Sequence, residues 1–177
     1  MYFITGNKGK FEEVKAMLPF MEQLDLDLPE IQELDAHAII RAKLHAAFEH
    51  KTGEFIVEDT SLYLDCLHSL PGTLIKWFLK AMGPEGLARL AVVLGDKKAQ
   101  AKVIIGYAKS PEEVVFFEGV IHGTIVLPRG LSGFGWDTIF QPEGYEKTFG
   151  EMSRTEKNAI SMRRISLMKL KEYLKKQ

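Results

Sequence analysis

The sequence lacks the features that mark several large classes of protein. Its 177 residues include one cysteine, Cys66, so no internal disulfide can form, and we expect Cys66 to be a structural thiol because nothing beside it suggests a lowered pKa. The formal net charge is −1, which gives no general attraction for nucleic acid or an anionic membrane. No apolar run approaches the ~20 residues of a membrane-spanning helix, and the first residues lack the apolar segment of a signal peptide. We therefore expect a cytoplasmic protein.

Several catalytic motifs are also missing. The five histidines form neither an H-E-x-x-H motif nor a Cys/His cluster, which argues against a zinc site. There is no G-x-S-x-G motif to indicate a serine hydrolase. The glycines that follow the first predicted strand match neither the P-loop nor the G-x-G-x-x-G pattern. The sequence also has no internal repeat, low-complexity tract or obvious linker.

What is present is an alternation of apolar strands and amphipathic helices. Asp35 can cap a helix whose inner face includes Ile40 and Lys43, Gly95 suits the end of another, and Ser153 with Glu156 forms a capping box. We predict strands at residues 2–5, 24–28, 55–57, 102–108, 114–124 and 138–140, and helices at 11–18, 36–47, 73–82, 84–94 and from 153 to the C-terminus. This pattern predicts an α/β fold with a mixed central sheet flanked by helices, in a single domain of residues 1–177.

The first candidate site is the segment Thr5-Gly6-Asn7-Lys8-Gly9-Lys10. It lies between a predicted strand and the N-terminus of a helix, where backbone N–H groups and the helix dipole favour an anion. Gly6 and Gly9 would let the backbone approach a phosphate closely, and the two lysines add positive charge. The alternative is an ordinary turn with solvated lysines.

A pair of carboxylates, Glu58 and Asp59, follows the apolar residues 55–57. Ligands of open α/β sheets bind at the carboxyl ends of strands. Together with Thr60, these carboxylates could hold Mg²⁺, which prefers oxygen ligands, or one of them could act as a general base for water. Glu30 is a third candidate carboxylate. The alternative is an acidic loop that caps a helix or is simply solvated.

Two further segments could contact a ligand. In Gly133-Phe134-Gly135-Trp136-Asp137 an aromatic side chain flanked by glycines could stack on a base, and Asp137 could accept a hydrogen bond from a base edge or a sugar. The last predicted helix carries Lys157, Arg163 and Arg164, and arginine binds phosphate and planar acceptors. The alternatives are aromatic side chains that fill the core and a solvated basic face of the helix.

Taken in order, these segments resemble the inosine triphosphate pyrophosphatase family over nearly the whole chain. The resemblance rests on five stretches: T-G-N-x-x-K at 5–10, V-E-D-T-S at 57–61, L-P-G-T-L-I-K-W-F at 70–78, G-F-G-W-D at 133–137 and the residues around 150–158. It implies Mg²⁺-dependent hydrolysis of ITP, dITP or XTP to the monophosphate and pyrophosphate. It also implies two lobes with a cleft between them, and a homodimer, to which the stretch 77–79 could contribute. No nucleic-acid or membrane partner is implied.

The resemblance also implies roles for individual residues. Glu30 and Asp59 match metal-linked positions, and Asp59 is the candidate that activates water. Arg163 matches a base-reading arginine. The positions that match substrate contacts are Thr5, Gly6, Asn7, Lys8, Lys10, Arg41, Thr60, Lys76, Phe134, Gly135, Trp136, Asp137, Lys157, Met162 and Arg163.

Two positions depart from the family pattern. Ser161-Met162-Arg163 stands where the family has Ser-His-Arg, and Arg41 stands where the family often has lysine. Methionine cannot replace the hydrogen bonds of histidine, so a different or broader nucleotide preference is an alternative within the same class. An alternative of another class is a nucleotide-binding regulator without catalysis. A nucleic-acid-binding module is disfavoured by the near-neutral charge.

Overall fold

The computed structural model describes residues 1–131 and 134–177, which form two compact units. Each unit is assembled from segments that are distant in the sequence, and long strands begin in one unit and end in the other. Unit 1 comprises Met1–Asp59, Val103–Gly119 and Arg163–Gln177, and unit 2 comprises Thr60–Lys102 and Val120–Met162.

Within the described residues, seven strands form one sheet with the order β2-β1-β3-β5-β6-β7, and β4 pairs with β3. β1 is parallel to both β2 and β3, whereas the β3–β4 and β6–β7 pairs are antiparallel. The predicted mixed sheet is therefore confirmed. The strands are β1 (Tyr2–Ile4), β2 (Glu22–Leu24), β3 (Phe55–Leu64), β4 (Pro71–Gly72), β5 (Lys98–Ala108), β6 (Val114–Ile125) and β7 (Phe140–Pro142).

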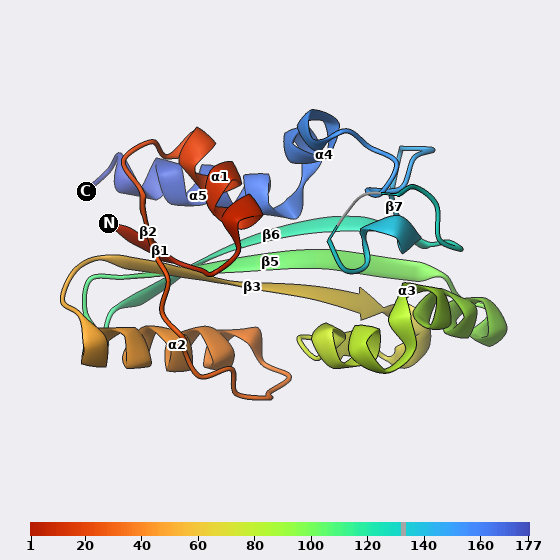
Figure 1. The fold of residues 1–177 in the computed structure, drawn as a ribbon, viewed down its shortest axis with the longest axis horizontal. Helices are drawn as coiled ribbons and strands as arrows, with labels where there is room; N and C mark the ends of the chain where they lie inside the picture. The colour runs from red at the N-terminus through yellow and green to blue at the C-terminus, as the bar shows by residue number, and fades with distance from the viewer. Residues whose placement is uncertain (132–133) are drawn as a thin grey trace. The chain divides into compact units, whose positions relative to one another are not determined.

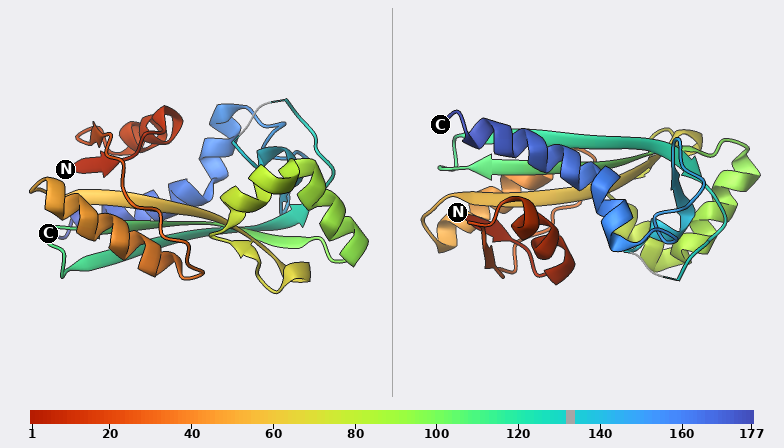
Figure 2. Two further views of the ribbon diagram at one scale, coloured as in Figure 1. Left: turned by 60° about the horizontal axis from the view of Figure 1, so that its bottom comes forward. Right: turned by 90° about the horizontal axis from the view of Figure 1, so that it is seen from above.

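In unit 1, helices cover both faces of the sheet. α2 (Ala36–His50) packs on one face, and α1 (Lys8–Met17) and α5 (Met162–Leu174) lie on the other (Figures 1 and 2). Asp35 caps α2 by accepting a hydrogen bond from the His37 N–H, as predicted. The helix buries a stripe at the i, i+3 and i+4 spacing of an amphipathic helix. Its members are Ala36, Ile39, Ile40, Leu44 and Ala47.

The contact between α2 and β5 depends on a glycine. A Cβ atom on Gly106 would lie 2.2 Å from Cγ2 of Ile40 and 3.2 Å from Cδ1 of Leu44. No side chain fits in that space, so Gly106 lets the helix approach the sheet closely. The resulting core of unit 1 also contains Ile4, Phe55, Val57, Ile104 and Ala108.

In unit 2, α3 (Ile75–Leu94) contains a break at Gly83, which has φ 68°, and Pro84 follows it. The two helical segments predicted here are therefore present, and Gly95 ends the second one in a left-handed conformation. Unit 2 also contains η1 (Asp65–Leu67), η2 (Asp137–Ile139) and α4 (Arg154–Ile160). The capping box of Ser153 and Glu156 at the start of α4 is confirmed.

Several predicted elements have different bounds. Residues 138–139, predicted as strand, belong to η2, and the strand there, β7, begins at Phe140. β5 begins at Lys98 rather than at residue 102. The strand predicted at 24–28 is β2, which ends at Leu24, and the short strand predicted at 55–57 is the ten-residue β3. The final helix is interrupted at Ser161, whose extended backbone (φ −63°, ψ 151°) separates α4 from α5. Within residues 1–131 and 134–177, no helix has the length and apolar character that crossing a membrane requires.

Candidate functional site

The predicted phosphate loop connects β1 to α1 in unit 1. Asn7 is the N-cap of α1, and its Oδ1 accepts a hydrogen bond from the Lys10 N–H at 3.0 Å. The Thr5 hydroxyl oxygen accepts from the Asn7 N–H at 3.1 Å. Thr5 and Asn7 therefore fix the backbone of the loop, while Gly6 and Lys8 are exposed. This is the strand–loop–helix arrangement that suits an anion, and phosphate binding itself stays a prediction.

A buried ion-pair cluster lies next to this loop. Glu58 Oε1 is 2.9 Å from Lys10 Nζ and 2.8 Å from Nη2 of Arg163, and Glu58 Oε2 is 2.7 Å from Nε of Arg163. The Nη1 group of Arg163 donates to Glu13 at 2.7 Å. We call Lys10, Glu13, Glu58 and Arg163 the buried charge cluster. It joins α1, β3 and α5 within unit 1.

Two opposing effects set the pKa values in this cluster. Burial alone would raise the pKa of Glu58, but the Arg163 guanidinium and the Lys10 ammonium outweigh it and hold that pKa well below its ordinary value. Burial would lower the pKa of Arg163, whereas Glu58 and Glu13 raise it. Glu58 and Arg163 therefore stay charged at neutral pH. Three N–H groups of Arg163 donate to carboxylates. Contact between Arg163 and a base stays a prediction.

Asp59 faces away from the buried charge cluster. Successive side chains of a strand point to opposite faces, so Asp59 lies on the opposite face from Glu58. That face is covered by α2, because Val57 packs in the core with α2. Glu30 is on the same side of unit 1, and its Oε1 is 4.0 Å from Nζ of Lys43 on α2. The structure thus divides the predicted carboxylates between the two faces of β3.

The position of Glu58 and Asp59 on the strand also differs from the prediction. They lie inside β3 rather than at its end. The parallel neighbour β1 pairs Tyr2 with Phe55 and Phe3 with Ile56, and it ends at Ile4. Both carboxylates therefore lie beyond the carboxyl end of β1. The strand end at which a ligand is expected is thus the end of β1, the shorter strand, and not the end of β3.

The ligands that Mg²⁺ prefers can be compared with the carboxylates of the described residues. Within residues 1–131 and 134–177, no group of three or more His, Cys, Asp or Glu residues is arranged to hold a metal ion. Mg²⁺ usually keeps several waters and is bound through one or two carboxylates together with substrate phosphates. Asp59 and Glu30 fit that donor chemistry. Glu58 does not fit, because both of its oxygens accept hydrogen bonds from cations.

In unit 2, the predicted base-and-sugar loop is organised by Asp137. Its carboxylate is buried, and Oδ2 accepts from the Phe134 N–H and from Lys157 Nζ, each at 2.5 Å. Lys157 Nζ also lies 5.3 Å from the centre of the Phe149 ring. Asp137 thus ties the loop to α4. Gly133, which belongs to the same motif, lies outside the described residues.

The two aromatic side chains of this loop have different environments. Phe134 is 50% exposed, whereas Trp136 is 1% exposed and packs against Phe140 and Phe149. Trp136 therefore follows the alternative of an aromatic side chain that fills the core, here the core of unit 2, and contact of either residue with a base stays a prediction. Gly135 between them has φ 55°, a conformation that favours glycine.

The remaining predicted contacts are scattered. Arg41 is exposed and its guanidinium lies 4.9 Å from the centre of the Phe116 ring, while Lys76 is exposed in the first turn of α3. Thr60 is half-buried in β3. Met162 is 4% exposed, so the structure favours core packing over a side chain presented to a ligand.

Sequence reasoning missed three residues that contact the candidate site residues. Glu13 gave no local signal of its pairing with Arg163, and Phe149 gave none of its contact with Lys157. Lys43 did carry a signal, because a lysine on the predicted inner face of α2 needs a polar partner. Its nearest carboxylate in the structure is that of Glu30.

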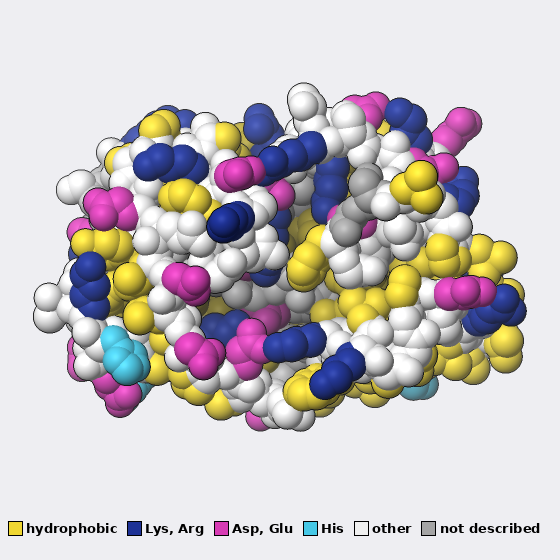
Figure 3. Space-filling view, in the orientation of Figure 1, with side chains coloured by type: hydrophobic (Ala, Val, Ile, Leu, Met, Phe, Trp, Pro, Cys, Tyr) yellow, Lys and Arg dark blue, Asp and Glu magenta, His cyan; other side chains and the backbone are white. Residues whose placement is uncertain are grey.

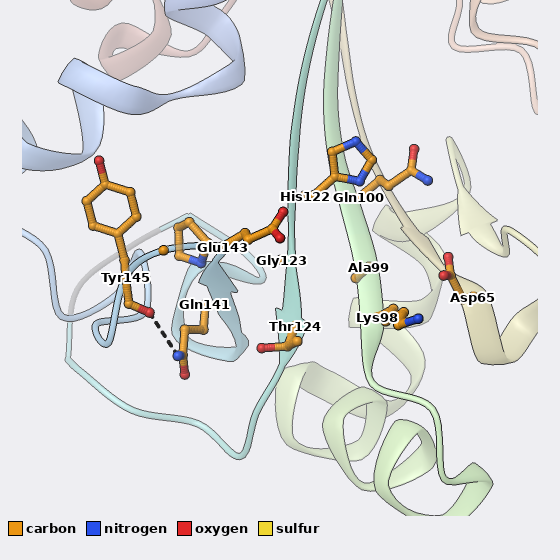
Figure 4. A pocket seen from close by; sticks show the side chains of 12 residues that line it. Asp65, Lys98, Ala99, Gln100, His122, Gly123, Thr124, Gln141, Glu143 and Tyr145 are labelled. Atoms are coloured by element: carbon orange, nitrogen blue, oxygen red, sulfur yellow. Dashed lines mark hydrogen bonds between the residues drawn. The ribbon is translucent and has the colours of Figure 1, made fainter.

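Unit 2 also has a separate hollow of about 410 Å³. Figure 4 shows side chains from β5, β6, β7 and the turn after β7 around it. Its lining mixes acids, bases and amides, among them Asp65, Lys98, His122 and Glu143. None of the predicted site residues lines this hollow.

Comparisons with known proteins identify relatives that match almost the whole chain. The Ham1 family matches residues 1–173. The inosine triphosphate pyrophosphatase of Schizosaccharomyces pombe is 41% identical over 99% of this chain and 95% of its own length, and that of Podospora anserina is 45% identical over 99% and 94%.

Solved structures give the same result for the fold. The Ham1 protein of Staphylococcus aureus has a TM-score of 0.81 at 25% identity and covers 99% of this chain and 98% of its own. A nucleoside-triphosphatase, also named dITP/XTP pyrophosphatase, from Mycobacterium abscessus has a TM-score of 0.72 at 26% identity over 96% of this chain and 98% of its own. The chain belongs to the Ham1 family.

Proposed function

We propose that this protein hydrolyses non-canonical purine nucleoside triphosphates (ITP, dITP and XTP) to the monophosphate and pyrophosphate, with Mg²⁺. The observation that carries this proposal is 41–45% identity, over almost the whole chain, to relatives named inosine triphosphate pyrophosphatase. The described side chains support it, since one group suits phosphate and another suits a base. The protein would be a hydrolase acting on acid anhydrides and would remove these nucleotides from the cellular pool.

Unit 1 supplies groups for the triphosphate. The N-terminus of α1 and the ammonium of Lys10 would bind phosphate oxygens. Asp59 and Glu30 would hold Mg²⁺, which when bound neutralises phosphate charge and the charge that develops on the leaving pyrophosphate. Asp59 would accept a proton from the attacking water. The water oxygen then bonds to the α-phosphorus as the bond from that phosphorus to the bridging oxygen breaks, and pyrophosphate leaves.

Unit 2 supplies groups for the nucleoside. The exposed ring of Phe134 would stack on the purine, and the hydrogen bond from its N–H to Asp137 holds the backbone that carries this ring. A site that donates to the 6-oxo group of hypoxanthine or xanthine would reject adenine, because adenine leaves the donor unpaired. The candidate donor, Arg163, belongs to unit 1.

A broader nucleotide preference is a second candidate function. Met162 is buried at 4% exposure and offers only a weak acceptor, so position 162 would supply no hydrogen bond to a base. The predicted result is weaker discrimination of ITP from ATP than in a relative with histidine. A non-catalytic nucleotide-binding regulator is disfavoured, because Asp59 and Lys10 retain the chemistry of hydrolysis.

A homodimer and a cytoplasmic location are part of the same proposal. Trp77 is 44% exposed, and the end of α3 presents Val92, Val93 and Leu94 with exposed fractions of 43%, 82% and 49%. Figure 3 shows hydrophobic side chains gathered over this end of α3. Exposed apolar side chains on one helix suit an interface between protein chains. A protein that sediments as a monomer at micromolar concentration would contradict a stable dimer.

The experiment that tests the proposed function is a substrate panel. Purified protein with Mg²⁺ is offered ITP, XTP, dITP, GTP, ATP and UTP, and kcat/KM is measured from pyrophosphate release. The expected order places ITP, dITP and XTP first. Similar kcat/KM values for all purine triphosphates would favour the broader preference, and nucleotide binding without turnover would favour the regulator.

A further inference from the structure

Glu58 is the one member of the buried charge cluster that touches both of its cations. Its carboxylate joins Lys10 of α1 to Arg163 of α5 with contacts of 2.7–2.9 Å. The proposed function assigns it no role. We propose that Glu58 is a positioning residue that holds the Lys10 ammonium and the Arg163 guanidinium in place for an incoming triphosphate. This inference rests on the proposed function for the identity of the substrate.

Direct participation of Glu58 in catalysis does not fit its surroundings. Its side chain is 1% exposed, and both oxygens accept hydrogen bonds from cationic groups. A general base or a metal ligand must offer a lone pair to water or metal. Asp59, on the opposite face of β3, is half-buried and suits that task better. Glu58 therefore acts through its two cations.

The charges explain why a carboxylate is needed at this position. Lys10 and Arg163 contribute two positive charges, and Glu58 and Glu13 contribute two negative ones. Without Glu58, Glu13 still pairs with Arg163 at 2.7 Å, but the Lys10 ammonium loses this anchor. The side chain of Lys10 is 19% exposed, so the ammonium could then move into solvent. Ordering a long lysine side chain before substrate arrives reduces the entropy lost on binding.

Glu58 also fixes elements that are far apart in the chain. Glu58 and Arg163 are separated by 105 residues in the sequence. The same carboxylate therefore anchors the helix that begins at the phosphate loop and the helix that begins near the predicted base-reading arginine. A stable bridge between the two helices would hold the Lys10 ammonium and the Arg163 guanidinium in fixed positions relative to each other. Removing the bridge should weaken phosphate binding through Lys10.

A double-mutant cycle on Glu58 and Lys10 tests this inference. The variants are Glu58→Gln, Lys10→Met and the double variant, with Glu12→Gln as a matched control that removes an exposed carboxylate from the same helix as Lys10. The first readout is the affinity for inorganic tripolyphosphate in EDTA, measured by calorimetry. The second is kcat/KM for ITP with Mg²⁺. Thermal unfolding of each variant shows that it is folded under the assay conditions.

The expected result is a loss of tripolyphosphate affinity in Glu58→Gln of about 10- to 150-fold, the range of a hydrogen bond to a charged group. The double variant should bind no more weakly than Lys10→Met, because the two residues act as a unit. Glu12→Gln should show no coupling to Lys10→Met. If Glu58→Gln does not fold, Glu58→Asp, which retracts the carboxylate by one methylene, replaces it in the cycle with the same expectation.

The outcomes separate this inference from the proposed function. Tripolyphosphate affinity within about twofold of wild type in Glu58→Gln, or fully additive losses with Lys10→Met, would overturn the positioning role. A wild-type protein that binds tripolyphosphate but hydrolyses no nucleoside triphosphate would overturn the proposed function, while the binding cycle would still decide the role of Glu58.

Discussion

The hydrogen bonds of Asp137 make a quantitative prediction about the loop that carries Phe134. We expect Asp137→Asn, which keeps the shape and removes the charge, to destabilise the protein and to weaken nucleotide binding. Oδ2 of Asp137 accepts from both Lys157 Nζ and the Phe134 N–H, and the Asp137 side chain is 2% exposed. An asparagine offers a single side-chain oxygen and carries no negative charge to pair with the Lys157 ammonium.

The size of the loss in stability depends on how exposed the side chain of Lys157 is. Breaking a fully buried ion pair costs about 3–5 kcal/mol because a charge is left without a partner. The side chain of Lys157 is 18% exposed, so its ammonium can turn toward water. The expected loss is therefore that of a charge-assisted hydrogen bond, about 1.5–3 kcal/mol. For a protein of this size the corresponding drop in Tm is about 3–12 °C.

Denaturant unfolding of the wild type, Asp137→Asn, Lys157→Met and the double variant measures this effect. The double variant should be less destabilised than the sum of the two single variants, because each of them breaks the same pair. The KM for ITP should rise in Asp137→Asn, since the Phe134 backbone loses its anchor. A free energy of unfolding within about 0.5 kcal/mol of wild type would refute the assignment of Asp137 as the residue that organises this loop.

Other predictions address the remaining residues. Asp59→Asn should lower kcat for ITP by about 10²–10⁴-fold with an unchanged circular dichroism spectrum, and activity within a few-fold of wild type would place the base elsewhere. Phe134→Ala should weaken nucleotide affinity by about 1–3 kcal/mol with little change in stability, whereas Trp136→Ala should destabilise the fold by about 3–5 kcal/mol, and the reverse pattern would contradict their assigned environments. Hydrogen bonds, first from Lys147 and then from the capping box, lower the pKa of Glu156 from 4.5 to about 2. The stability that they add is present above the unfolded pKa and is lost as pH falls toward the folded one. Glu156→Gln should therefore flatten this acid limb in denaturant unfolding from about pH 5 to about pH 2, and an unchanged limb would exclude Glu156 as its source.

Local sequence signals predicted much of the fold. The N-cap of Asp35, the capping box of Ser153 with Glu156 and the helix end at Gly95 were all confirmed, because each depends on residues within one turn of helix. The amphipathic stripe of α2 was confirmed for the same reason. The alternation of strands and helices was sufficient to predict a mixed α/β fold.

The length of β3 could not be predicted in this way. The apolar run ends at Val57, and the polar residues that follow resemble a loop. In the structure the strand continues to Leu64 because its backbone pairs with neighbouring strands and because Leu62 and Leu64 are buried. Pairing between strands depends on the fold and overrides local polarity.

The buried charge cluster was also beyond the reach of sequence patterns. Glu58 and Arg163 were each identified as candidates, but no local spacing predicts a contact across 105 residues. The burial of Trp136 beside an exposed Phe134 was equally hidden, since both are aromatic residues of the same short motif and each follows a glycine. Their different environments follow from the packing of Trp136 on Phe140 and Phe149.

The most direct test of the central claim is the identity of the products of ITP hydrolysis. Purified protein is incubated with ITP and Mg²⁺, and the nucleotide and phosphate products are separated by ion-exchange chromatography, with an EDTA-treated sample as control. The account predicts IMP and pyrophosphate in equal amounts and no turnover in EDTA. IDP and orthophosphate as the first products would contradict cleavage between the α- and β-phosphates.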